Sequence, residues 1–458
     1  MSHENREMNG RYFSSLFHKV SENIGNLLDR LRAPGTGGQD ILQLAEALLS
    51  GQGEASGVAV AREFLTAYDG LPEEKKISFF ALMGQQFGPD QARLEKALAT
   101  FANTPTAKAT LEMQEAAASR RQVLFRRIAL AHAGTKGLLQ MREDVLHHLP
   151  AHPELAPVDA DLRHLFSSWF NRGFLVMKKL DWTSPANILE KIIRYEAVHQ
   201  IASWDDLRRR LEPSDRCCFA FFHPTMEDEP LIFVAVALTS DVPEAIAPLL
   251  ADHRNPIPAG HATSAVFYSI SNCQVGLRGV PLGDFLIKQV VEELKQELPS
   301  LKTFVTLSPV PGFMRWLSQE RGKDVSDHVA EGDKATLALL DRPDWHLDAE
   351  AVRTLKPLLL PAVAAYLLTV RTDSGKPIDP VARFHLGNGA RLERINWRSD
   401  LTPKGLMQSA GFMVNYLYEL DRIERNQEAL AHHGEIASSP AVRKLLRSDI
   451  RKRSGSPS

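Results

Sequence analysis

The chain has 458 residues, 44% of them hydrophobic and 24% charged, which is the balance of a globular protein long enough for two hydrophobic cores. Its 54 basic and 56 acidic side chains leave a formal net charge of -2, which argues against nucleic-acid and membrane-surface partners, because both favour a strong basic excess. The three cysteines (Cys217, Cys218 and Cys273) have neither the spacing of a disulfide framework nor that of a zinc site. We therefore expect no metal, no membrane partner and a cytoplasmic location.

The first part of the chain has a helical pattern from about residue 10 to residue 170. Apolar residues recur three and four positions apart, for example in 41–48 and in 124–130. The alanine-rich stretch 106–133 predicts one long helix. We assign residues 1–158 to an all-α N-terminal domain. A separate helical domain of this kind is typical of a homo-oligomer, a dimer or a tetramer.

A segment rich in histidine and proline, residues 147–153, ends this helical part. Three histidines so close together suggest a metal site, but no carboxylate or cysteine cluster accompanies them in the sequence. We interpret the segment as a hinge loop between domains.

The second part, residues 159–442, has strand-like runs that alternate with helical ones. Predicted strands are rich in Val, Ile and Phe and are bounded by Pro, Asn and Gly; they cover 217–222, 231–238, 264–270 and 302–307. Predicted helices cover 282–298, 348–370 and 404–421. This alternation is typical of an α/β domain. The basic and then Ser/Gly-rich tail, residues 443–458, is expected to be mobile.

A glycine-bearing turn between a predicted strand and a predicted helix is a candidate phosphate site. Its residues are Arg278, Gly279, Val280, Pro281, Leu282, Gly283 and Asp284. Backbone N–H groups and the positive end of a helix dipole point together at such a turn, and Arg278 adds a guanidinium. Many glycine turns are only tight turns, so the local signal is weak. The spacing resembles the acyl-CoA pyrophosphate loop of the GCN5-related acetyltransferases, although Pro281 stands where that pattern has glycine and removes one N–H donor.

Three further residues are candidates for chemistry. Ser308 follows a buried-looking strand and precedes Pro309, a position common among site residues of α/β proteins but also that of a simple corner. His385 lies in an apolar, strand-like run before an Asn-Gly turn, where a lone histidine is more often part of the core. Tyr418 lies in a segment that predicts a helix, 405–420, with aromatic residues at a spacing that also suits core packing.

Together these segments resemble the malonyl-CoA decarboxylase family. The resemblance rests on four phrases in order along the chain: FYSISNCQVGLRGVPLGDFLIKQVVEEL, FVTLSPVPGF, FHLGNGARLERINW and GFMVNYLY. It implies a helical N-terminal domain used in assembly and a catalytic domain of acetyltransferase-like (GNAT) fold. It places the family's catalytic serine and histidine on Ser308 and His385, an active-site tyrosine on Tyr418, and the CoA loop on 278–284.

The implied reaction converts malonyl-CoA to acetyl-CoA and carbon dioxide without a cofactor, because the thioester itself accepts the electrons left by carbon dioxide. We expect His385 to remain partly protonated near neutral pH and to donate the proton, while Ser308 orients the departing carboxylate. Two alternatives share the same fold and CoA loop: an acyl-CoA-dependent acyltransferase and a non-catalytic acyl-CoA sensor.

Overall fold

The computed structural model describes residues 37–50, 54–280 and 286–446. These residues form two compact units. The first unit runs to Leu175 and includes two short returns of the chain, residues 223–227 and 274–282; the second contains the remainder. The division comes after Leu175, whereas the domain boundary expected at residue 158 falls inside a helix, α9 (Ala156–Trp169).

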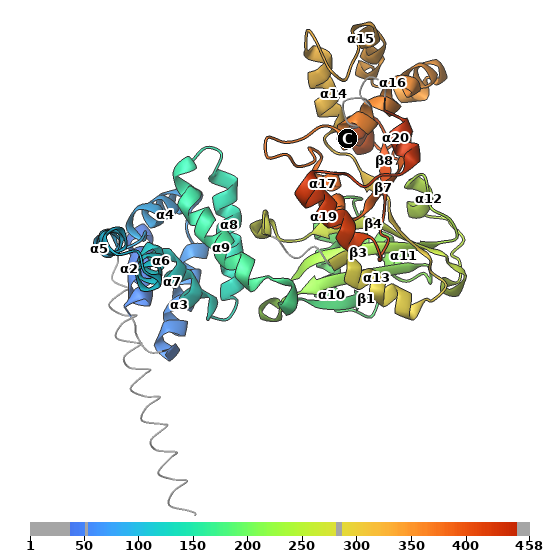
Figure 1. Cartoon of the computed structure of the whole chain (residues 1–458). Helices are drawn as coiled ribbons and strands as arrows, with labels where there is room; N and C mark the ends of the chain where they lie inside the picture. The colour runs from blue at the N-terminus through green and yellow to red at the C-terminus, as the bar shows by residue number, and fades with distance from the viewer. Residues whose placement is uncertain (1–36, 51–53, 281–285, 447–458) are drawn as a thin grey trace, which may run out of the picture. The chain divides into compact units, whose positions relative to one another are not determined.

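The first unit is helical throughout its described residues, as expected. Its other helices are α2 (Gly37–Leu49), α3 (Glu54–Asp69), α4 (Glu73–Gln86), α5 (Gln91–Asn103), α6 (Ala107–Ala117), α7 (Arg120–Ala129) and α8 (Gly134–His148) (Figure 1). The prediction of one helix over 106–133 is wrong. Ala118 is extended, and the Ser119 side chain accepts a hydrogen bond from the backbone of Gln122, so that Ser119 caps a new helix.

A buried arginine links three helices of this unit. Arg121, on α7, is 5% exposed and donates to Asp161 of α9 and to the carbonyl oxygens of Met83 and Gly84 on α4. A buried guanidinium is tolerated because all its polar contacts are made by an acid and by backbone oxygens. It therefore holds the helices in register.

The second unit is built on a mixed sheet with strand order β1-β2-β3-β4-β5-β8-β6, in which β7 also pairs with β8. Only β4 and β5 pair in parallel among the described strands. The four predicted strands are confirmed, and so is the α/β class of this part of the chain. The strands are β1 (Val176–Leu180), β2 (Arg216–Phe222), β3 (Pro230–Thr239), β4 (Ser264–Asn272), β5 (Thr303–Thr306), β6 (Ser308–Pro309), β7 (Arg391–Asn396) and β8 (Met413–Leu417).

Helices cover the sheet and extend beyond it; α14, α15 and α16 gather together beyond the strands (Figure 1). The helices of this unit are α10 (Ala186–Tyr195), α11 (Trp204–Leu211), α12 (Ala247–Leu250), α13 (Leu286–Glu297), α14 (Phe313–Gly322), α15 (Glu331–Leu337), α16 (Ala349–Leu368), α17 (Pro380–Gly387), α18 (Pro403–Ser409), α19 (Ile423–His433) and α20 (Pro440–Lys444). By length and hydropathy α16 would suffice to cross a membrane, but 56% of its apolar window is buried inside the protein, as in a core helix.

Two predicted elements near the C-terminus are wrong. The segment 404–421 is not one helix: α18 ends at Ala410 and Gly411, which both have positive φ (52° and 80°), and β8 follows. The run around His385 is not a strand but helix α17, because the Asp379 carboxylate caps its first turn and Pro380 suits the first helical position.

Candidate functional site

Ser308 lies where β5 gives way to β6, one residue after Leu307. The Ser308 side chain is buried, and its hydroxyl donates to Thr306 Oγ1 at 2.8 Å. Thr306 Oγ1 also accepts the backbone N–H of Tyr416 from the neighbouring strand β8 at 3.2 Å. The ladder of the sheet therefore places the oxygen to which the Ser308 hydroxyl donates in the free protein.

His385 is carried by α17, whose start is rigidly held. Asp379 accepts hydrogen bonds from the backbone of Val381 and Ala382 and from the hydroxyl of Tyr366 at 3.2 Å. Gly312 packs against this corner, because a Cβ there would lie 2.3 Å from the Tyr366 hydroxyl oxygen. The phrase FVTLSPVPGF thus supplies both Ser308 and the glycine that leaves room for the cap of the histidine's helix.

A chain of hydrogen bonds joins the three candidate residues of the second unit. Ser308 Oγ lies 3.0 Å from His385 Nε2, and His385 Nδ1 lies 2.8 Å from the Tyr418 hydroxyl oxygen. Since the Ser308 hydroxyl hydrogen is directed to Thr306, Ser308 accepts from Nε2–H. The Tyr418 O–H then donates to Nδ1, which assigns the Nε2–H tautomer to a neutral imidazole.

Burial determines which of these hydrogen-bonded residues are charged. His385 is 3% exposed, and desolvation lowers its pKa to about 3, so the imidazole is neutral at pH 7 in the free protein. The expectation that His385 stays partly protonated near neutral pH is therefore wrong for the free protein. Desolvation raises the pKa of Tyr418 well above its usual value, so its hydroxyl keeps the proton that it donates.

A pocket of about 210 Å³ opens onto this pair. Its wall is mainly apolar, with Phe267 and Leu307 among the lining residues beside Ser308 and His385. Tyr416, on β8, stacks on the imidazole with ring centroids 4.7 Å apart and an interplanar angle of 25°. The Ser308–His385 pair thus lies against an aromatic ring in a small site of low polarity.

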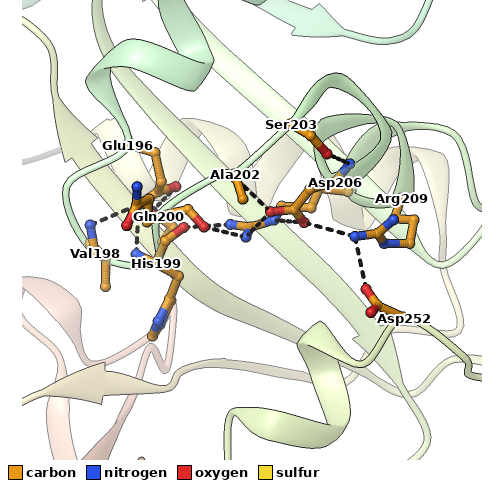
Figure 2. A network of polar contacts seen from close by, with 11 residues as sticks. Glu196, Val198, His199, Gln200, Ala202, Ser203, Asp206, Arg209 and Asp252 are labelled. Atoms are coloured by element: carbon orange, nitrogen blue, oxygen red, sulfur yellow. Dashed lines mark hydrogen bonds and ion pairs between the residues drawn. The ribbon is translucent and has the colours of Figure 1, made fainter. Parts of the chain in front are cut away.

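The loop that contributes Val198 to the pocket lining is held by a polar network (Figure 2). Glu196 accepts the backbone N–H groups of Val198 and His199 and the hydroxyl of Ser269, on β4. Arg210, on α11, donates to the carbonyl oxygens of His199 and Gln200 at 2.6 and 2.9 Å. Because both the N–H and the C=O groups of the loop are bound, Val198 is held in its place in the pocket wall.

The candidate phosphate turn begins in the first unit. Its described part, Arg278 to Val280, follows a 3₁₀ turn, and Gly279 has a positive φ of 75°, which favours glycine. The Arg278 side chain is exposed and makes no ion pair within the described residues. Pro281, Leu282, Gly283 and Asp284 lie outside the described residues, as does the tail from residue 447.

The histidine segment 147–153 is only partly a loop, because His147 and His148 form the last turn of α8. Among the residues that the structure describes, no three His, Cys, Asp or Glu side chains are grouped to hold a metal ion. Sequence reasoning missed Thr306, Tyr416 and Glu196, whose roles depend on contacts between distant strands. The capping pair Asp379-Pro380, by contrast, was a readable signal for the helix of His385.

Comparisons with known proteins agree over most of the chain. Residues 87–170 match the malonyl-CoA decarboxylase N-terminal domain, and residues 173–456 match the malonyl-CoA decarboxylase C-terminal domain. Mitochondrial malonyl-CoA decarboxylase from the goose Anser anser anser is 34% identical over 83% of this chain and 82% of its own.

Two solved structures are also similar. The crystal structure of malonyl-CoA decarboxylase from Rhodopseudomonas palustris is 55% identical, covering 90% of this chain and 100% of its own, with a TM-score of 0.87. The enzyme from Agrobacterium vitis is 52% identical, covering 89% and 100%, with a TM-score of 0.85.

Proposed function

Because this chain belongs to the malonyl-CoA decarboxylase family, we propose that its buried Ser308–His385 pair carries out the decarboxylation. The chain is a carboxy-lyase that converts malonyl-CoA to acetyl-CoA and carbon dioxide. The observation that supports the assignment of the pair is the 3.0 Å contact of Ser308 Oγ with His385 Nε2 at the wall of a small pocket.

The decarboxylation requires few catalytic groups from the protein. The bond between the carboxylate carbon and the α-carbon breaks, carbon dioxide leaves, and the electron pair moves into the thioester carbonyl to give an enolate. The α-carbon then takes one proton to form the acetyl group. The thioester is the electron sink, so the protein must orient the carboxylate, exclude water and deliver that proton.

His385 is the proton donor in this proposal, although it is neutral in the free protein. A malonyl carboxylate that enters the buried pocket brings a negative charge next to the imidazole, and a nearby opposite charge raises a histidine pKa. His385 then takes up a proton from solvent at Nδ1 as substrate binds, and the Tyr418 hydroxyl turns to accept that N–H. The Nε2 proton goes to the α-carbon once carbon dioxide has left, which leaves the ring neutral. A placed general acid contributes roughly 10²–10⁴ in rate.

Ser308 and Tyr418 orient this donor. Tyr418 holds Nδ1 through its hydroxyl, which leaves Nε2 directed at Ser308 and the pocket. The Ser308 hydroxyl is able to turn from Thr306 to the malonyl carboxylate, because hydroxyl hydrogens rotate freely about the C–O bond. Ser308 is then the residue that orients the carboxylate before it departs.

The CoA moiety is assigned to the segment 278–284. The exposed guanidinium of Arg278 and the glycine turn beside it support a pyrophosphate contact. The residues Pro281, Leu282, Gly283 and Asp284 belong to the same proposal on the resemblance of the sequence alone. No metal or other cofactor enters the proposed reaction.

Location and assembly are part of the proposal as well. Three buried free cysteines suit a reducing compartment, which supports the cytoplasm, although the goose relative is named as mitochondrial. The helical first unit supports a homo-oligomer, a dimer or a tetramer, which light scattering of the purified protein would measure.

The test is to incubate purified protein with malonyl-CoA, without added metal or cofactor, and to follow acetyl-CoA by mass spectrometry. Wild type should form acetyl-CoA, and both Ser308→Ala and His385→Asn should lose most of that activity. Full activity in either variant would remove that residue from the site. Acetyl transfer to an added amine would favour the acyltransferase alternative, and tight binding without turnover would favour the sensor.

A further inference from the structure

The segment that leads into the CoA loop is anchored on the first unit by a buried arginine. Arg142, on α8, is 1% exposed. Its guanidinium donates to Asp159 at 2.8 Å, to the carbonyl oxygen of Gly276 at 2.6 Å and to the carbonyl oxygen of Arg278 at 2.9 Å. All three guanidinium nitrogens are therefore used, and two of them hold the backbone of the turn that presents Arg278.

The packing around Arg142 leaves the turn little freedom. A Cβ at Gly276 would lie 2.3 Å from the carbonyl oxygen of Leu139, so glycine lets this backbone lie directly on α8. Leu277 and Val280 are buried, and the N–H groups of Arg278 and Val280 close successive turns onto Val275 and Leu277. The backbone of Arg278 is thus held while its side chain is exposed.

We infer that Arg142 is a positioning residue for CoA binding, and that helix α8 is part of the CoA-binding device rather than of an assembly module alone. The inference rests on the proposed role of Arg278 in CoA binding. Arg142 does not touch the ligand in this account. It fixes the direction in which Arg278 presents its charge to the pyrophosphate, and a lysine cannot do this because it lacks the planar fork of donors.

The first unit contains a matched control. Arg121 is also buried, also pairs with an aspartate of α9, and also donates to two backbone carbonyl oxygens, those of Met83 and Gly84. Those oxygens belong to α4 and not to the candidate loop. Arg142→Lys and Arg121→Lys therefore remove the same kind of interaction, and only the first should affect CoA.

The experiment measures the Kd for CoA by calorimetry, and KM and kcat for malonyl-CoA and for malonyl-pantetheine, which lacks the nucleotide and its pyrophosphate. Loss of the charge-assisted contacts should raise Kd and KM for the CoA compounds about tenfold in Arg142→Lys, with kcat little changed. For malonyl-pantetheine, Arg142→Lys and wild type should have the same KM and kcat. Arg121→Lys should bind CoA as wild type does, even where its melting temperature falls.

The double variant Arg142→Lys/Arg278→Ala tests whether Arg142 affects CoA binding through Arg278. If Arg142 acts through Arg278, the double variant should bind CoA no more weakly than Arg278→Ala alone. Equal Kd values for CoA in wild type and Arg142→Lys would overturn the inference, as would an equal loss with malonyl-pantetheine. The two proposals fail separately. If wild type released no carbon dioxide from malonyl-CoA but Arg142→Lys still bound CoA more weakly than wild type, the role of Arg142 would be upheld and the proposed decarboxylation rejected.

Discussion

The Ser308–His385 pair and the Arg278 turn meet opposite physical demands. The pair is buried under apolar side chains, and in the free protein its imidazole has no charge. The turn carries an exposed guanidinium on a backbone that is held from beneath. One region excludes water and charge, and the other presents charge to water.

In the proposed function, this difference matches the chemistry of the two ends of malonyl-CoA. The reactive end must lose a carboxylate and form an enolate, and electrostatic interactions with both are stronger where water is absent. The nucleotide end carries permanent phosphate charge, which an exposed arginine binds without burying an unpaired cation in the free protein. The two regions should therefore respond differently to mutation, acid and salt.

The largest expected effect is on turnover. His385→Asn removes the proton donor while filling most of its space, so kcat should fall roughly 10²–10⁴-fold. KM for malonyl-CoA should stay within about twofold of wild type, because the proposal places the CoA moiety at Arg278 and not at His385. Steady-state kinetics with the purified variant gives both constants. A rise in KM with unchanged kcat would place His385 in substrate binding instead.

Acid should destabilise the buried region. The native pKa of His385 is about 3, whereas an unfolded histidine titrates near its model value of 6.5, so between these values the unfolded chain binds the extra proton. Stability is therefore lost as pH falls below 6.5, and His385 should account for about 2 kcal/mol between pH 7 and pH 5.

The measurement is urea unfolding at both pH values, with His385→Asn as the control, because other groups titrate alike in both proteins. The wild type should lose more free energy of unfolding than the variant. Parallel losses would mean that His385 titrates normally in the folded protein.

A smaller effect is expected from the tyrosine. Tyr418→Phe removes the hydroxyl that donates to His385 Nδ1 and thereby fixes the tautomer. Loss of one hydrogen bond of this kind should lower kcat about tenfold. Tyr416→Phe is the matched control, because the Tyr416 hydroxyl has no hydrogen-bond partner within the described structure. Equal losses in both variants would point to packing rather than to orientation.

The smallest expected effect is that of salt, which should change substrate binding at the Arg278 turn but not turnover at the Ser308–His385 pair. An exposed arginine is screened within about 10 Å at 0.1 M ionic strength, and a buried pair is screened far less. Raising the salt concentration should therefore increase KM for malonyl-CoA a few-fold and leave kcat unchanged. A fall in kcat with constant KM would reverse the comparison.

The sequence was a good guide where local pattern decides the structure. Runs such as 231–238 are apolar over their whole length, because β3 is buried on both faces. Ser308 was expected at the end of a strand, and it lies there. The helical first part was equally readable, apart from the break at Ser119, where a capping serine outweighs the helical preference of the alanines around it.

Contacts between distant segments were not readable. Ser308 and His385 are 77 residues apart, and only the pairing of β6 with β8 and the packing of α17 bring them together. The low pKa of His385 depends on burial, which no spacing reveals. The sequence around Arg142 gives no sign of its partners Gly276 and Arg278, which lie more than a hundred positions further along the chain.

The central claim is that His385 is neutral in the free protein and gains a proton when a malonyl carboxylate binds. Nitrogen NMR of histidine-labelled protein tests it directly, with His385→Asn to assign the signals and sulfoacetyl-CoA as an unreactive anionic analogue. The account predicts a neutral Nε2–H imidazole in free protein at pH 7 and a protonated ring in the complex. A His385 ring that is already cationic without ligand, or neutral in both states, would contradict it.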